Sequence, residues 1–341
     1  MVQTRGLAVK GRGRRAGGRE FEREGTVAAT RETVERAPES IENQEARPKL
    51  GPLSPADKVV IAYLAIVGFL ILLFSNRIEH WGLLCAGHVA VIVVVTMLAK
   101  WDRSSRPALS FAHGWYPILL IGLTYKELTY LIPRIHPRDF DAALAAIDYR
   151  IFGVNPTVWL ERFTWPPLTE VLQLTYSTYY FLPIILGAVL WGKGWFDKFY
   201  YWVFLVLFGF YLSYLGYVAV PAIGPRFLPS IVEAQTKPLI GVWLFLPVRQ
   251  MLDNAEGLTR DCFPSGHTEV TLLVLYYAHR FHRKVFWWFL PFGIGIIIST
   301  VYLRYHYVVD VVAGAVLALI VIAVAKPLHR LLDRRAAPDN R

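Results

Sequence analysis

Two histidines, a carboxylate and a Ser-Gly helix start are the residues of this chain whose types and spacing can do chemistry. Cys-Phe-Pro-Ser-Gly-His occupies residues 262–267, and His306 follows with Asp310 four positions further on. Residues at i and i+4 of a helix share a face, so the carboxylate can hold one nitrogen of His306 and leave the other free to attack phosphorus. His267 can protonate the leaving oxygen. The pattern predicts phosphoryl transfer; the alternative is a pair of buried histidines that only satisfy hydrogen bonds between helices.

A phosphate group needs positive charge and free N–H groups around it, and four further residues can supply them. Ser265 and Gly266 open a predicted helix, whose free N–H groups and dipole attract an anion. Arg226, in a Gly-Pro-Arg loop sequence, can bind two phosphate oxygens at once. Arg304 precedes His306 by two residues and is either a second clamp or an arginine that extends to the membrane interface.

The elements that must position these residues are membrane-spanning helices. Of the 341 residues, 55% are hydrophobic. Apolar runs near 20 residues long occur repeatedly along the chain, which is not typical of soluble domains. The fold class is therefore all-α, a polytopic membrane helix bundle with about eight transmembrane helices. The predicted spans lie at about residues 58–75, 81–99, 115–133, 167–191, 199–220, 267–281, 285–303 and 306–325.

Basic residues predict the orientation of this bundle. With a cytoplasmic N-terminus, the loops assigned to the inside, at residues 100–106, 193–198 and 280–284, are dense in Lys and Arg. We therefore expect a multi-pass protein of the cell membrane with both termini cytoplasmic and the two histidine motifs on the extracytoplasmic side. Between the third and fourth spans, residues 139–163 predict an amphipathic helix that lies in the membrane interface.

The chain outside the apolar runs has a different composition. Residues 1–56 are rich in Gly, Arg and Glu with almost no aromatic residues, which predicts a disordered basic cytoplasmic tail, and residues 326–341 form a second cytoplasmic tail. The basic tip, residues 5–19, suits anionic lipids; nucleic acid is not an expected partner because aromatic residues do not interleave. Cys85 and Cys262 give no disulfide framework and no metal spacing.

These motifs resemble the type 2 phosphatidic acid phosphatase superfamily, whose three ordered motifs are Lys-x6-Arg-Pro, Pro-Ser-Gly-His and Ser-Arg-x5-His-x3-Asp. The chain matches the second motif at residues 264–267 and the third at Ser299, His306 and Asp310. It departs where Ala219 replaces the lysine, Gly-Pro-Arg-Phe replaces Arg-Pro, and Thr300 replaces the phosphate-binding arginine. The resemblance covers residues 115–325, which implies a six-helix phosphatase-type core preceded by two extra transmembrane helices at residues 57–114.

The resemblance also implies a mechanism and a site. His306 attacks phosphorus and forms a phosphohistidine, Asp310 orients it, and His267 protonates the leaving oxygen and then activates the incoming water or alcohol. Arg226, Ser265 and the Gly266 amide stabilise the phosphate oxygens, with Arg304 as a candidate second clamp. No metal and no cofactor is expected.

Three functions remain open. The first is an integral membrane phosphatase that cleaves a lipid phosphate ester. The second is transfer of a phospho-alcohol head group to a lipid hydroxyl such as that of a ceramide. It is suggested by the Tyr-rich segment 302–307 and the Asp-x-x-Ile-Phe-Gly sequence at residues 148–153, which resemble the inositol-phosphorylceramide synthase branch. The third is a non-catalytic lipid transporter on the same scaffold, against which the intact histidines and Asp310 argue.

Overall fold

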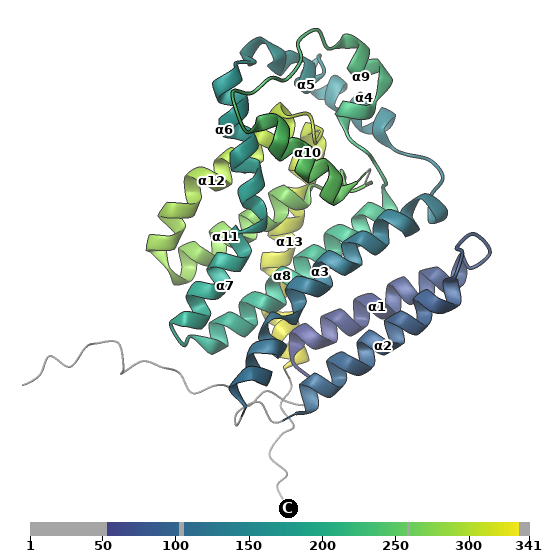
Figure 1. Ribbon diagram of the computed structural model, residues 1–341, viewed down its shortest axis with the longest axis vertical. Coiled ribbons are helices and arrows are strands. Elements are labelled where there is room, and N and C mark those ends of the chain that lie inside the picture. Colours follow the sequence, from purple (N-terminus) through teal and green to yellow (C-terminus); the bar gives the residue numbers. More distant parts are fainter. Residues whose placement is uncertain (1–52, 102–105, 258–259, 334–341) are drawn as a thin grey trace, which may run out of the picture. The chain divides into compact units, whose positions relative to one another are not determined.

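A computed structural model describes residues 53–101, 106–257 and 260–333 of the chain (Figure 1). Most of the predicted N-terminal tail and residues 334–341 of the predicted C-terminal tail lie outside the described residues. The described part is helical and contains no β-strand, which confirms the all-α fold class.

The eight predicted spans all form helices. Five of these helices are long and apolar enough to cross a membrane, namely α1 (Pro55–Leu73), α2 (Trp81–Lys100), α8 (Phe196–Ala219), α12 (Arg283–Tyr302) and α13 (Val308–Leu332). The segment Pro166–Tyr180 contains α6 (Pro166–Ser177) and η2 (Thr178–Tyr180). It forms a sixth crossing if it is counted as one bent span with α7 (Leu182–Gly192), at an angle of 48°. The other two predicted spans form α3 (Pro107–Ile135), which is more polar, and α11 (Gly266–Phe281), which has only 16 residues.

Helix α8 is the centre of the bundle, and it contacts α1, α3, α7, α11 and α13. Several of its large apolar side chains, among them Phe204 and Leu207, are fully buried. The ring of Tyr63 in α1 stacks on Tyr211 in α8 with centroids 4.0 Å apart. Tyrosines of α8 therefore serve helix packing, and the N-terminal helices pack directly on the remainder of the bundle (Figure 1).

Two histidine–carboxylate pairs join α1 and α2 to α3. The Nε2 atom of His113 lies 2.9 Å from Asp57, and both side chains are buried. Nε2 of His88 lies 2.9 Å from Glu127. Such groups are costly in a membrane unless they are paired, so these contacts favour one arrangement of α1 and α2 against α3.

The predicted amphipathic segment is helical, with α4 (Asp141–Phe152), α5 (Pro156–Trp159) and η1 (Leu160–Phe163). In α4 the acidic residues Asp141 and Asp148 are buried, while Ile147 and Ile151 are exposed. The helix thus buries both carboxylates together with Leu144 and exposes isoleucines, whereas a helix on a soluble protein exposes mainly polar side chains. The loop that follows α8 contains three short helices, η3 (Pro225–Phe227), α9 (Pro229–Ala234) and α10 (Phe245–Glu256).

Candidate active site

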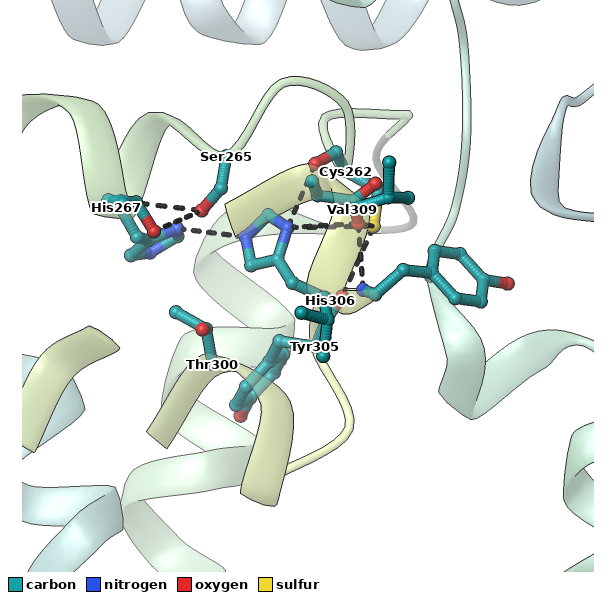
Figure 2. Close-up of polar contacts among 12 residues, drawn as sticks. Cys262, Ser265, His267, Thr300, Tyr305, His306 and Val309 are labelled. Carbon is teal, nitrogen blue, oxygen red and sulfur yellow. Dashed lines mark hydrogen bonds and ion pairs between the residues drawn. The ribbon is translucent and has the colours of Figure 1, made fainter. Parts of the chain in front are cut away.

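His267 and His306 are in contact, although they are far apart in the sequence (Figure 2). His267 lies in the first turn of α11, and His306 lies in the turn between α12 and α13. Nδ1 of His267 is 3.3 Å from Nε2 of His306. The two residues are only 8% and 4% exposed. The structure therefore brings together the two imidazoles that the sequence pattern singled out.

The starts of α11 and α13 are held together through their backbones. The N–H of Ser265 donates to the carbonyl oxygen of Asp310 at 3.0 Å. Gly314, one turn beyond Asp310 in α13, makes this approach possible: a Cβ atom there would lie 2.3 Å from the carbonyl oxygen of Ser265. A larger residue at position 314 would push the two helix starts apart.

Ser265 caps α11, as predicted for a serine before a helix. Its Oγ accepts the N–H of Thr268 at 3.3 Å, and the serine is fully buried. Gly266 is the first residue of the helix. Its N–H lies at the positive end of the helix dipole, beside His267.

The second nitrogen of His306 faces two acceptors. Nδ1 lies 2.8 Å from the carbonyl oxygen of Cys262 and 3.6 Å from Oδ2 of Asp310. A carbonyl oxygen only accepts, so Nδ1 carries the proton and Nε2 presents its lone pair towards His267. The shorter contact is with the carbonyl of Cys262, which the sequence pattern had not indicated.

Asp310 accepts two other hydrogen bonds. Its Oδ2 receives the N–H of Tyr307 at 2.8 Å and the S–H of Cys262 at 2.9 Å. Burial, together with the negative charge of Asp310, raises the pKa of the Cys262 thiol well above its ordinary value. Cys262 is thus a protonated thiol that donates to the carboxylate.

His267 lies within a column of aromatic rings that the sequence had not revealed. Its ring stacks on Tyr176, with centroids 4.6 Å apart, and contacts the tilted ring of Tyr179 at 4.2 Å. Tyr176 stacks in turn on Tyr305 at 4.5 Å. The two tyrosines come from α6 and η2, far from the Pro-Ser-Gly-His motif in sequence. The sequence feature that could have indicated them is their spacing of three residues, which is common in any helix.

Arg226 stands at the end of this column. Its guanidinium lies 4.6 Å from the centroid of Tyr305, and its Nη1 donates to Asp253 at 2.6 Å. Burial lowers the pKa of Arg226, but the hydrogen bond and the charge of Asp253 outweigh burial, so the pKa lies above its ordinary value. Gly224 permits the turn because its φ is 108° and a Cβ atom there would lie 2.5 Å from the carbonyl oxygen of Tyr305.

Arg304 and Thr300 are engaged elsewhere. The guanidinium of Arg304 donates to Glu161 at 2.9 Å, to Gln235 at 2.7 Å and to the carbonyl of Lys237 at 2.6 Å. Thr300 uses its hydroxyl within α12. Its carbonyl oxygen accepts the N–H groups of the two residues that end the turn, Tyr305 and His306, each at 2.9 Å. Arg304 therefore secures the neighbouring loop, and Thr300 holds the turn that presents His306.

The two buried carboxylates of α4 hold the loops of the site. Asp148 accepts the N–H groups of Val308 at 2.7 Å and Val309 at 2.9 Å, the first residues of α13. Asp141 accepts the N–H of Gly224 at 2.7 Å and the hydroxyl of Tyr307 at 3.0 Å. Burial raises the pKa of Asp148, and the hydrogen bonds from the start of α13 oppose the rise. The Asp-x-x-Ile-Phe-Gly segment thus positions the start of α13.

An apolar cavity leads to His267. It has a volume of about 470 Å³ and lies between α3, α7 and α8, with the end of α10 at its rim. Its lining follows α3 from Gly114 to Lys126. At 1.5 Å per residue this is about 18 Å, more than half the ~30 Å thickness of a bilayer core.

The rim of this cavity is polar. Lys126, Glu256 and Asp261 lie there together with His267. Burial and the neighbouring charge of Asp261 raise the pKa of Glu256 to about 7. The rest of the lining is mostly apolar and aromatic, including Trp115 and Trp202.

Comparison with known proteins agrees with this geometry. The family model of the PAP2 superfamily matches residues 142–324, more than half of the chain, and the chain therefore belongs to this superfamily. A PA-phosphatase related-family protein of Dictyostelium discoideum is 26% identical over 164 residues, or 43% of this chain. The match covers only 30% of that protein's length. No solved structure matches the chain. The resemblance expected from the two histidine motifs is confirmed.

Proposed function

We propose that this protein is an integral membrane enzyme that cleaves lipid phosphate esters through a phosphohistidine, without a metal cofactor. The observation that carries the proposal is the contact of Nε2 of His306 with Nδ1 of His267, 3.3 Å apart, where an apolar cavity ends. The cavity suits a hydrocarbon chain, and a phosphate attached to that chain would lie beside both imidazoles.

His306 is the nucleophile in this proposal. Its Nε2 lone pair attacks phosphorus while the bond from phosphorus to the leaving oxygen breaks. The carbonyl of Cys262 and the carboxylate of Asp310 hold the Nδ1 proton and stabilise the positive charge that develops on the ring. The substrate enters between the two imidazoles, so binding separates them.

His267 transfers the protons. It donates one to the departing oxygen in the first step and removes one from the incoming water in the second, after which His306 is free again. Arg226, the Gly266 amide and the capped Ser265 form the positive end of the site and stabilise the phosphate oxygens. Arg304, which binds Glu161, supports this site from the loop and is not assigned to the phosphate.

Head-group transfer to a lipid hydroxyl is the second candidate. The apolar cavity favours it, since an acceptor with its own hydrocarbon chain can enter where water is scarce. The chemistry is the same except that His267 removes the proton from an alcohol.

The proposal also includes the domain organisation and the orientation of the protein in the membrane. Two N-terminal membrane helices, α1 and α2, lie outside the catalytic core, and the expected core boundaries at residues 115 and 325 fall within α3 and α13. Both termini lie in the cytoplasm, with anionic lipids at the basic tail, and the site faces the extracytoplasmic side. The Lys- and Arg-rich loops support this orientation.

The test uses the purified protein and a phospholipid that carries a radioactive phosphate. Release of free phosphate without an acceptor identifies a phosphatase, and label in a new lipid when a lipid alcohol is added identifies a transferase. Acid quenching should trap label on the wild-type protein. No turnover and no trapped label with a panel of phospholipids would support the transporter instead.

Substitution of His306 is the sharpest control. His306→Ala should abolish both turnover and trapped label, since it removes the nitrogen that forms the covalent intermediate in this proposal. His279→Ala, at the opposite end of α11, is the matched variant and should retain both. More than ~1% of wild-type activity in His306→Ala would contradict the mechanism.

A further inference from the structure

Three donor atoms of different chemistry converge on the side of His306 that faces away from His267. Sγ of Cys262 lies 2.9 Å from Oδ2 of Asp310 and 3.6 Å from Nδ1 of His306. Nδ1 of His306 lies 3.6 Å from the same Oδ2. All three side chains are buried, and Oδ1 of Asp310 has no hydrogen-bond partner among the described residues. The mechanism proposed above uses neither the sulfur nor this free oxygen.

These separations match those around a tetrahedral metal ion. Bonds of about 2.0–2.3 Å to sulfur, nitrogen and oxygen place neighbouring ligands about 3.3–3.7 Å apart. Two of the three separations already have this length, and the contact between sulfur and carboxylate needs to open by roughly half an ångström. Thiolate, imidazole and carboxylate together favour a soft or borderline cation over Mg²⁺ or Ca²⁺.

We propose that Cys262, His306 and Asp310 form a binding site for a thiophilic divalent cation such as Zn²⁺ or Cd²⁺, and that occupation of the site inactivates the enzyme. The charge balance favours binding in a buried place. The site carries one negative charge when Asp310 is ionised and the thiol is protonated. A divalent cation displaces the thiol proton to solvent and leaves a neutral assembly of two anions and one dication.

The inactivation follows from the tautomer of His306 and rests on the proposed function. A metal bound at Nδ1 takes the lone pair of that nitrogen, and the proton that Nδ1 carried moves to Nε2. Nε2 then has no lone pair for phosphorus. The cation therefore acts as an inhibitor at the nucleophile, on the face opposite the substrate.

The experiment compares the wild type with Cys262→Ser and Cys85→Ser, each as the full chain in detergent. Serine keeps a hydroxyl that can donate to Asp310 but removes the soft ligand. Cys85→Ser is the matched control because Cys85 lies in α2, apart from the site. Each protein is incubated with Cd²⁺ before the substrate is added, since the ligands are buried.

Two readouts are taken, the ultraviolet absorption of a cadmium–thiolate bond and the activity relative to the same variant without metal. The wild type and Cys85→Ser should show the absorption band and lose activity together. Cys262→Ser should lack the band, and the Cd²⁺ concentration that halves its activity should rise by at least about tenfold.

The absorption readout is independent of the proposed function. If the protein turns over no lipid, a band that disappears only in Cys262→Ser still supports the metal site. A band of equal strength in Cys262→Ser, or a band lost in Cys85→Ser, would overturn it. Equal inhibition of the wild type and Cys262→Ser would show that Cd²⁺ acts elsewhere and would also overturn the proposal.

Discussion

Asp148 offers the most direct test of how the site is built, because it touches the start of α13 and not the substrate. Its carboxylate accepts the N–H groups of Val308 and Val309 at 2.7 and 2.9 Å, two and three residues beyond His306. Each charge-assisted bond of this kind contributes about 1.5–3 kcal/mol. Asp148→Ala should therefore lower the local opening free energy of this turn by about 3–6 kcal/mol, while Asp148→Asn, which keeps a neutral acceptor, should cost about half as much.

Hydrogen exchange measured by mass spectrometry reports this local opening free energy directly. A loss of 3–6 kcal/mol speeds amide exchange in peptides that cover Val308 and Val309 by about 10²- to 10⁴-fold, with peptides of α2 as the internal reference. Turnover should fall by about 100-fold because His306 is displaced, with little change in KM, since the cavity is untouched. Unchanged exchange at the start of α13 in Asp148→Ala would refute the reasoning. So would a loss of activity that appears only as a higher KM.

Three further predictions concern charge and packing. The pKa of Glu256 is raised to about 7 from 4.5. Between these values Glu256 keeps its proton in the folded protein, while the unfolded chain releases it. The free energy of unfolding should therefore fall by about 3 kcal/mol as the pH rises from about 5 to 7. Thermal unfolding across this range should show the slope in wild type and not in Glu256→Gln; a slope that survives the substitution would assign it to another group. Arg226→Ala should lower kcat/KM by about 10²- to 10³-fold, whereas Arg304→Ala, which breaks a buried ion pair, should mainly lower stability by about 3–5 kcal/mol. Steady-state kinetics and unfolding measurements of both variants test this. A large loss of kcat/KM in Arg304→Ala together with a loss of stability in Arg226→Ala would exchange the roles of the two arginines. Gly314→Ala places a Cβ atom 2.3 Å from the Ser265 carbonyl oxygen and should reduce turnover by about 100-fold. Gly87→Ala is the control, because its Cβ atom meets nothing within 4 Å, and it should leave turnover unchanged. Equal activities of the two variants would show that the starts of α11 and α13 can move apart freely.

The sequence determined the helices and the candidate reacting groups. Apolar runs locate membrane helices because a bilayer admits little else, and all eight predicted spans are helical in the structure. The Pro-Ser-Gly-His segment starts α11 with a serine cap, as local preferences require. Asp310 lies in the first turn of α13 and His306 lies two residues before this helix begins, so the spacing can be read from the chain alone, but the two residues do not share a helix as expected.

The partners of those groups could be known only from the tertiary structure. The i, i+4 spacing suggested that Asp310 holds Nδ1 of His306, yet the shorter contact is with the carbonyl of Cys262, since a backbone oxygen leaves no trace in a sequence pattern. Arg226 was the expected phosphate ligand, and Arg304 was either a second ligand or an arginine at the membrane interface. Their side chains are long, and the position of Glu161 decides that Arg304 is occupied.

The packing of Tyr176 and Tyr179 on His267 was likewise beyond the sequence. Local preferences act over a few residues and place helices, caps and turns. The geometry of the site arises where elements that together span more than a hundred residues of the chain are packed together, and packing distances depend on every side chain between them. The two histidines could therefore be named as candidate reacting groups from the sequence, whereas the 3.3 Å contact between them belongs to the fold.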